Sequence, residues 1–192
     1  MQGTTLSFRN IHHHGELFEK IMKARKPAQL PDDWDVTATG NQEFDQYDTP
    51  QSRWLAVHDD KGDVLASVRL TPTTAQSGIY SYLMRDAQQG LLEEVPADLL
   101  FDDAPVAEDI WEMTRVFVQR GLVTAKRDDV RRNIIQQLIK TTQTEEIRQL
   151  VALLPNSWRK WAEAGKFEMT AAGRVWNTRG RDYQAHWLTI QP

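Results

Sequence analysis

The sequence contains no cysteine among its 192 residues, which excludes disulfides, thiolate zinc sites and a cysteine nucleophile. No apolar run approaches the ~20 residues that a membrane helix needs. Residues 1–10 also lack the basic and apolar segments of a secretion signal. The formal net charge is −4, whereas nucleic-acid-binding chains are usually basic. These absences predict a cytoplasmic soluble protein that binds no nucleic acid and associates stably with no membrane.

Histidine is scarce as well, and the run at residues 12–14 is the one stretch that suggests a metal. Adjacent histidines on a loop cannot all bind one ion comfortably, so the sequence predicts no metal site. His58 and His186 fall in predicted strands, where we expect them to have no chemical role.

The composition that remains, 40% hydrophobic and 26% charged, is typical of one globular domain. Apolar residues at helical spacing predict a helix over 15–26, which Pro27 should end before an irregular loop. Residues 53–59 and 64–72 predict an antiparallel hairpin, and residues 109–118 alternate as a strand does.

The second half predicts an amphipathic helix over 129–143, a strand over 147–154, a helix over 156–165 and then further strands. From residue 109 onward this order resembles the acyltransferases of the GCN5-related type, in which two central strands splay apart and admit the pantetheine of the acyl donor. We therefore predict an α+β fold, an α/β/α sandwich around a mixed, mostly antiparallel sheet with a V-shaped splay. Residues 1–192 are expected to form one domain, with 1–40 as an N-terminal helix and mobile lid.

Charged residues interrupt the predicted apolar strands at Arg69, Glu112 and Arg115, and Asp45 and Asp48 precede the hairpin. Because an unpaired buried charge costs several kcal/mol, buried charges occur in pairs. The two arginines and three acids therefore predict an ion-pair cluster, which is either a functional site or a structural network. Each residue alone could instead face solvent, and Asp48 could simply open the strand in an Asx-turn.

Four segments in sequence order resemble the acyl-homoserine-lactone synthases, the autoinducer synthases of bacterial quorum sensing. Residues 43–48, EFDQYD, are similar to the family's acidic motif, and residues 67–73, SVRLTPT, to its arginine strand. Residues 112–118, EMTRVFV, are similar to a third family motif, and Arg25 and Trp34 fit the arginine and tryptophan that precede the acidic motif.

The resemblance implies an enzyme that moves an acyl chain from acyl-carrier protein to the amine of S-adenosylmethionine, closes a lactone and releases methylthioadenosine, with no cofactor beyond these substrates. Glu112 would be the base, unless it only pairs with an arginine. Trp34 would face the sulfonium, unless it packs in the core. The implied catalytic residues are Glu112, Arg115, Arg69, Asp45 and Asp48, and the implied S-adenosylmethionine ligands are Arg25, Trp34, Asp45, Arg69, Thr114, Arg115 and Phe117.

The donor and its acyl chain also have candidate residues. A clean pyrophosphate loop is missing from residues 119–129, which disfavours coenzyme A. The basic residues that would dock the acidic carrier protein are Lys126, Arg127, Arg131, Arg132, Arg159 and Lys160, unless they form a solvated face with internal ion pairs. The candidate acyl pocket between the sheet and the last helices consists of Met113, Val151, Leu153, Leu154 and Trp158, unless these are ordinary core.

Two alternatives remain beside the synthase. The family normally has a phenylalanine four residues after its N-terminal arginine, where this chain has Gln29. That departure leaves room for another acyltransferase of the same fold, using acyl-CoA or a different amine. The second alternative is a synthase-like domain that binds a ligand without turnover.

Overall fold

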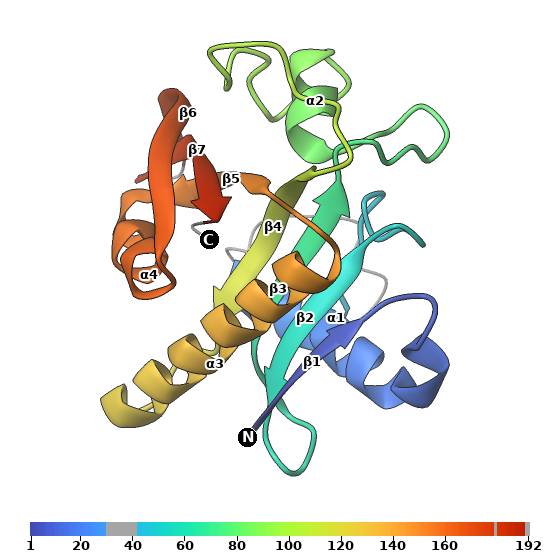
Figure 1. Cartoon of the computed structure of the whole chain (residues 1–192), viewed down its shortest axis with the longest axis vertical. Helices are drawn as coiled ribbons and strands as arrows, with labels where there is room; N and C mark the ends of the chain where they lie inside the picture. Colours follow the sequence, from blue (N-terminus) through green and yellow to red (C-terminus); the bar gives the residue numbers. More distant parts are fainter. Residues whose placement is uncertain (30–41, 179, 191–192) are drawn as a thin grey trace. The chain divides into compact units, whose positions relative to one another are not determined.

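The structure is a computed structural model that describes residues 1–29, 42–178 and 180–190 (Figure 1). The chain divides into two compact units, which are described separately. Unit 1 comprises Met1–Leu70 and Arg115–Thr141, and unit 2 comprises Thr71–Thr114 and Thr142–Pro192.

Unit 1 is built from strands with a helix on either side. Its elements are β1 (Gln2–Leu6), η1 (Ile11–His13), α1 (Gly15–Gln29), β2 (Arg53–His58), most of β3 (Val64–Pro72), the end of β4 (Ile110–Val118) and most of α3 (Thr124–Thr144). Antiparallel ladders join β1 to β2 and β2 to β3. The end of β4 lies beside the start of β3, because the Gln119 N–H donates to the Leu65 carbonyl at 2.8 Å.

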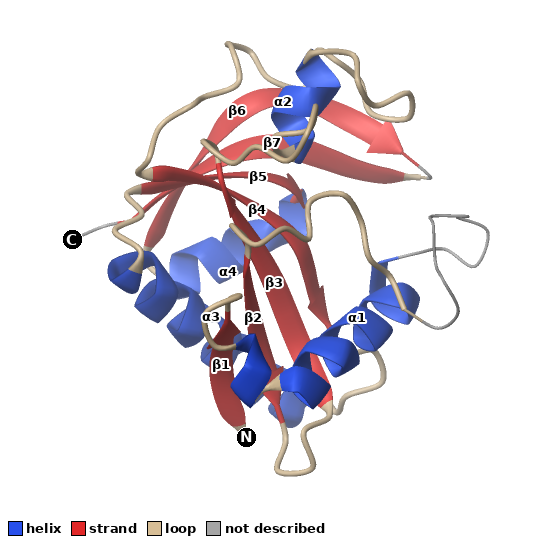
Figure 2. Ribbon diagram, turned by 90° about the vertical axis from the view of Figure 1, so that its right-hand side faces the viewer, coloured by secondary structure: helices blue, strands red, loops and turns tan. Residues whose placement is uncertain are grey.

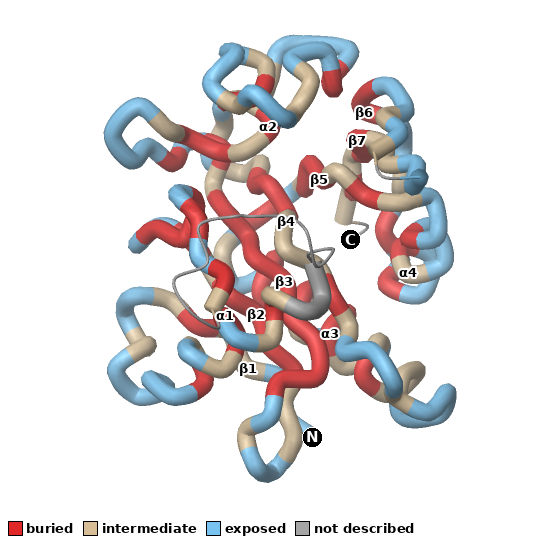
Figure 3. Tube along the Cα trace, turned by 180° about the vertical axis from the view of Figure 1, so that it is seen from behind, coloured by how far each residue is buried: buried red, intermediate tan, exposed pale blue. Residues whose placement is uncertain are grey.

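The apolar side of α1 contributes one hydrophobic cluster to the core of unit 1. Leu17, Ile21 and Met22 repeat at helical spacing and pack with Trp54 of β2 and Phe117 of β4. Figure 2 shows α1 and α3 on opposite faces of β1, β2 and β3. Figure 3 shows that β2 and β3 are largely buried between them. Polar side chains on these strands are therefore shielded from water as well.

Unit 2 contains α2 (Leu83–Gln88), the start of β4, β5 (Gln149–Pro155), η2 (Asn156–Trp158), α4 (Arg159–Ala164), β6 (Phe167–Thr178) and β7 (Arg181–Ile190). β7 pairs antiparallel with both β5 and β6. The parallel ladder of β4 and β5 covers four pairs, from Ile110↔Gln149 to Met113↔Ala152, and stops there although both strands continue. The hydrogen-bonded strand order is β1-β2-β3-β4-β5-β7-β6, which confirms the predicted α+β fold with a mixed sheet.

Several predicted elements are confirmed and others differ. The hairpin β2–β3 and the strand β4 lie where they were predicted. The helix α1 does not end at Pro27 but continues to Gln29, since a proline removes one helical hydrogen bond without preventing the chain from finishing the turn. The loop expected after it lies in residues 30–41, outside the described residues.

The remaining differences concern elements without strong periodicity. β1 was not predicted, because its sequence QGTTL has little apolar character. α3 begins five residues earlier than expected, at Thr124, and the segment 79–84 leads into the short helix α2. β6 is one long strand, interrupted by a register shift between Ala171 and Val175. No helix in the described part of the chain is long and apolar enough to span a bilayer.

Candidate active site

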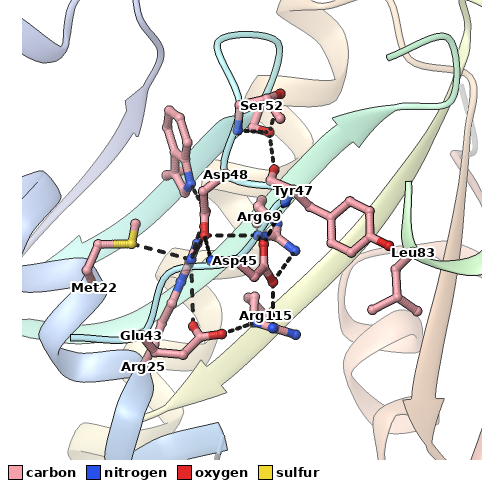
Figure 4. Close-up of polar contacts among 12 residues, drawn as sticks. Met22, Arg25, Glu43, Asp45, Tyr47, Asp48, Ser52, Arg69, Leu83 and Arg115 are labelled. Carbon is pink, nitrogen blue, oxygen red and sulfur yellow. Dashed lines mark hydrogen bonds and ion pairs between the residues drawn. The ribbon is translucent and has the colours of Figure 1, made fainter. Parts of the chain in front are cut away.

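Three arginines and three carboxylates meet in unit 1 and form one ion-pair network (Figure 4). The arginines come from a helix and two strands, and the carboxylates come from the turn that precedes β2. All except Arg115 are buried. The members of this network are Arg25 of α1, Arg69 of β3, Arg115 of β4, Glu43, Asp45 and Asp48.

Arg69 and Asp48 are the centre of the network. The Arg69 guanidinium holds Asp45 with two bonds, Nη1 to Oδ1 at 2.5 Å and Nη2 to Oδ2 at 3.1 Å. Its Nη1 also lies 3.1 Å from Asp48 Oδ2. Arg25 Nη1 donates to both oxygens of Asp48, at 2.8 and 3.0 Å, and the Trp54 indole donates to Oδ1 at 2.7 Å. Such forked, charge-assisted bonds fix orientation as well as charge.

Arg115 closes the network on its more exposed side. Its Nε donates to Glu43 Oε1 at 2.7 Å, and its Nη2 lies 2.5 Å from Asp45 Oδ2. The Arg115 side chain remains 20% exposed, whereas those of Arg25 and Arg69 are fully buried. Arg115 also has φ = 53°, a left-handed conformation within a strand. Such a conformation costs ~1 kcal/mol or more in a residue with a Cβ, and the ion pairs to Glu43 and Asp45 hold it.

The turn that carries the carboxylates is shaped by the same side chains. Asp48 Oδ2 accepts the Asp45 N–H at 3.1 Å, and Asp45 Oδ1 accepts the Tyr47 N–H at 2.9 Å. The Arg69 guanidinium lies 5.7 Å from the centre of the buried Tyr47 ring. Arg69, Arg115, Asp45 and Asp48 of the predicted ion-pair cluster therefore meet here, and the Asx-turn lies at Asp45 rather than at Asp48, where the alternative placed it. Phe44 is exposed.

The pKa values of the carboxylates reflect this surround. Burial alone would raise the pKa of Asp45, but the charges of Arg69 and Arg115 outweigh it and hold that pKa well below its ordinary value. Burial likewise opposes the effect of Arg25 and Arg69 on Asp48, whose pKa is also lowered. Both aspartates are consequently ionised at neutral pH.

Arg25 has donors to spare. Its side chain is fully buried, yet among the described residues its Nε and Nη2 have no hydrogen-bond acceptor. Burial lowers the pKa of Arg25, although Asp48 counteracts the effect. A buried donor without a partner is costly, so a polar group that reaches Arg25 would be stabilised there.

Glu112 lies in unit 2, and its carboxylate is held by backbone groups. It is fully buried, and its Oε2 and Oε1 accept the N–H groups of Leu83 and Met84 at 3.1 and 2.9 Å. Burial and the nearby Glu112 charge raise the pKa of Tyr82, which donates its hydroxyl to the Pro105 carbonyl at 2.6 Å. The tyrosine therefore stays protonated beside the carboxylate.

The predicted acyl-pocket residues do not share one face of the sheet. Val151 and Leu153 pack in a cluster with Tyr82. Leu154 points to the opposite face of β5, since side chains alternate along a strand, and Met113 shares that face because it pairs with Ala152. The predicted set, all of it buried or half-buried, is Met113, Val151, Leu153, Leu154 and Trp158.

The predicted docking residues fall in both units. On α3, Arg131 pairs with Asp128 at 3.3 Å and Arg132 pairs with Asp129, as the solvated-face alternative had it. Among the described residues Lys126 and Arg127 have no ion pair, and Lys126 is exposed. The two docking residues in unit 2, both exposed, are Arg159 and Lys160 of α4.

Other predicted residues have mixed outcomes. Phe117 belongs to the core beneath α1, Thr114 is half-buried in unit 2, and Trp34 lies outside the described residues. The set of candidate site residues omitted Glu43, although it opens the EFDQYD segment that drew attention to the two aspartates. In the described ranges no group of three or more histidine or acidic side chains is arranged to hold a metal ion.

Comparison with known proteins shows which family this chain resembles. Residues 12–144 match the family model described as autoinducer synthase. The acyl-homoserine-lactone synthase of Acinetobacter nosocomialis is 25% identical over 146 residues, which are 73% of this chain and 73% of that protein.

Two solved structures share the fold. The CoA-dependent acyl-homoserine lactone synthase BjaI, solved with SAM and isopentyl-CoA, superposes with a TM-score of 0.70 at 20% identity, covering 99% of this chain and 83% of that one. An acyl-CoA N-acyltransferase from Pseudomonas aeruginosa gives a TM-score of 0.53 at 10% identity over 99% of both chains. The chain therefore belongs to the autoinducer synthase family and is an acyl-homoserine-lactone synthase, an acyltransferase with the fold of the N-acyltransferases.

Proposed function

We propose that this synthase acylates the amine of S-adenosylmethionine from acyl-carrier protein, with Glu112 as the base. The observation that carries the proposal is the buried Glu112 carboxylate, oriented by two backbone N–H groups. A positioned carboxylate can take the ammonium proton directly or through one water.

The reaction then has two steps. The freed amine attacks the thioester carbonyl, the C–S bond breaks, and the thiolate of the carrier leaves and takes up a proton. A backbone N–H near residues 116–118 stabilises the negative charge on the tetrahedral intermediate. The substrate carboxylate next attacks its own γ-carbon, so the lactone closes and neutral methylthioadenosine leaves.

The ion-pair network has a binding role in this proposal. It balances three arginines with three carboxylates, so that it leaves little net charge of its own. Arg115 has an exposed side and Arg25 has spare donors, which suit the carboxylate of S-adenosylmethionine. Asp45 and Asp48 fix both arginines and tie the segment after α1 to the strands.

For the donor, Lys126 and Arg127 at the start of α3 support an acidic carrier protein, since neither forms an ion pair with any of the described residues. The second candidate is acyl-CoA, because the similar BjaI structure is that of a CoA-dependent synthase and contains isopentyl-CoA.

The decisive experiment compares the wild type with Glu112→Gln. Acyl-homoserine lactones are measured by mass spectrometry after incubating the purified protein and S-adenosylmethionine with hexanoyl-carrier protein or hexanoyl-CoA. Loss of a general base lowers kcat by ~10²–10⁴-fold. Glu168→Gln, on an exposed position of β6, is the matched control and should keep full activity. An unchanged rate in Glu112→Gln refutes the base, and a faster reaction with hexanoyl-CoA refutes the carrier protein.

A further inference from the structure

The helix that contacts Glu112 is too short to be stable on its own. α2 has six residues, and isolated helices much shorter than ~12 residues are marginal in water. Its N-cap, Tyr82, is extended and supplies no side-chain cap. The first N–H groups of α2 are thus free of a local cap and reach Glu112 instead. Something else must fix the direction in which they point.

A second buried carboxylate joins the start of this helix to the residue before its N-cap. Asp86 is fully buried in α2, and its two oxygens each accept the Ser81 N–H at 3.0 Å. Its Oδ1 also accepts the Ser81 hydroxyl at 2.6 Å. Ser81 directly precedes the N-cap, so these three bonds hold the chain that enters α2 against the first turn of the helix. We call this Asp86–Ser81 contact the clasp.

We infer that Asp86 and Ser81 are positioning residues for Glu112, acting through the backbone N–H groups of Leu83 and Met84. The inference rests on the proposed role of Glu112 as the base. Without the clasp the first turn of α2 frays, and Glu112 loses two donors that orient its carboxylate and stabilise its ionised form. Neither Asp86 nor Ser81 touches the reacting atoms in this account.

The chain offers a matched control at the other end of the same helix. The Gln88 amide donates to the Asp102 carbonyl at 3.0 Å and accepts the Ala104 N–H at 2.8 Å. Gln88→Ala therefore removes two tertiary hydrogen bonds from α2 and leaves the clasp intact. Ser81→Ala removes the hydroxyl from the clasp, and Ser81→Thr, which keeps a hydroxyl, is the conservative substitution at the same position.

The test measures pH–rate profiles of Asp86→Ala, Ser81→Ala, Ser81→Thr and Gln88→Ala with the acyl donor that the wild type prefers. In Asp86→Ala we expect kcat to fall by ~10–100-fold, part of the full contribution of a general base. The KM for S-adenosylmethionine should change little, and the acidic limb should move to higher pH. Ser81→Ala should show a smaller change in the same direction, Ser81→Thr should restore the wild-type profile, and Gln88→Ala should leave the limb in place. An unmoved limb in Asp86→Ala and Ser81→Ala, or an equal movement in Gln88→Ala, overturns the inference.

A second readout needs no turnover. Amide protons bound to a carboxylate resonate downfield, so NMR of the Leu83 and Met84 amides reports their bonds to Glu112 directly. Asp86→Ala and Ser81→Ala should shift these two resonances, and Gln88→Ala should not. If the wild type forms no lactone, the proposed function fails, yet the amide shifts still decide whether the clasp positions Glu112. Ser81→Ala keeps the buried aspartate and covers the case in which Asp86→Ala does not fold.

Discussion

The two units hold buried carboxylates in different ways. In unit 1, Asp45 and Asp48 are surrounded by guanidinium groups at 2.5–3.1 Å. In unit 2, Glu112 accepts two backbone N–H groups, and Asp86 accepts the N–H and hydroxyl of Ser81. Opposite charge stabilises the first pair, and oriented neutral dipoles stabilise the second.

The difference fits the roles proposed for the two groups of carboxylates, binding in unit 1 and chemistry in unit 2. A carboxylate locked in forked ion pairs has its proton affinity strongly reduced, as the lowered pKa of Asp45 shows, and is a poor base. The backbone N–H groups of Leu83 and Met84 orient the Glu112 carboxylate as neutral dipoles. This contrast favours the network of unit 1 for fixing substrate and geometry, and Glu112 of unit 2 for moving a proton.

Breaking the network should have the largest effect on stability. Arg69→Met removes the cation that both Asp45 and Asp48 contact, so that the three carboxylates of the network are left with two arginines. Breaking a buried pair from one side costs about 3–5 kcal/mol, which urea unfolding followed by circular dichroism would measure. Arg148→Met is the control, because the Arg148–Asp109 pair at 2.7 Å is exposed and should leave the midpoint unchanged. Equal midpoints for the two variants would contradict a structural role for the network.

The stability of the protein should depend on acid in two ways, because unit 1 contains the buried Asp45 and Asp48 and unit 2 contains the buried His186. Burial lowers the pKa of His186 in β7 and outweighs the backbone of Thr170, which acts to raise it. The pKa of His186 is therefore lower in the folded state than its unfolded-state value of about 6.5. The stability that depends on the neutral imidazole is fully present above the unfolded-state pKa and is lost as the pH falls through the folded-state pKa. The pKa values of Asp45 and Asp48 are lowered in the folded state too, so their contribution to stability is likewise lost as the pH falls below about 4.

We therefore expect stability to decline in two stages on acidification, measured as Tm between pH 7 and pH 3. His186→Leu should abolish the first stage, which begins below about pH 6.5, and leave the second. His13→Leu, at an exposed position, should change neither stage. A first stage that survives in His186→Leu would show that another group causes it.

Side chains in unit 1 were more predictable from the sequence than backbone contacts in unit 2. Arg69 and Arg115 stood out as charges inside apolar strands, and Asp45 and Asp48 were the acids available to balance them. Glu43 was not counted among these acids, although it opens the same EFDQYD segment.

The surroundings of Glu112 left no comparable signal. Every residue except proline carries a backbone N–H, so residue type does not indicate which N–H group will bind a carboxylate. The helix α2 is too short to be predicted from apolar periodicity. Its position depends on Asp86, whose partner Ser81 is five residues away. The faces of Met113 and Leu154 likewise required the strand register, which a single sequence does not contain.

The smallest effect should separate paired from unpaired charges on the surface of α3. Arg131 and Arg132 are already neutralised by aspartates three residues earlier, whereas Lys126 has no ion pair among the described residues. Because complementary charge mainly accelerates encounter, Lys126→Glu should raise the KM for acyl-carrier protein by roughly 3–10-fold at low salt and less at 0.5 M salt. Arg132→Glu should raise this KM less, because Asp129 already cancels part of the Arg132 charge in the wild type. Steady-state assays with both donors decide the point: a carrier protein that docks on this surface loses affinity, while KM for hexanoyl-CoA stays near its original value. An equal rise for both donors would instead place a phosphate-binding site at the start of α3, because the phosphopantetheine arm and coenzyme A share that group.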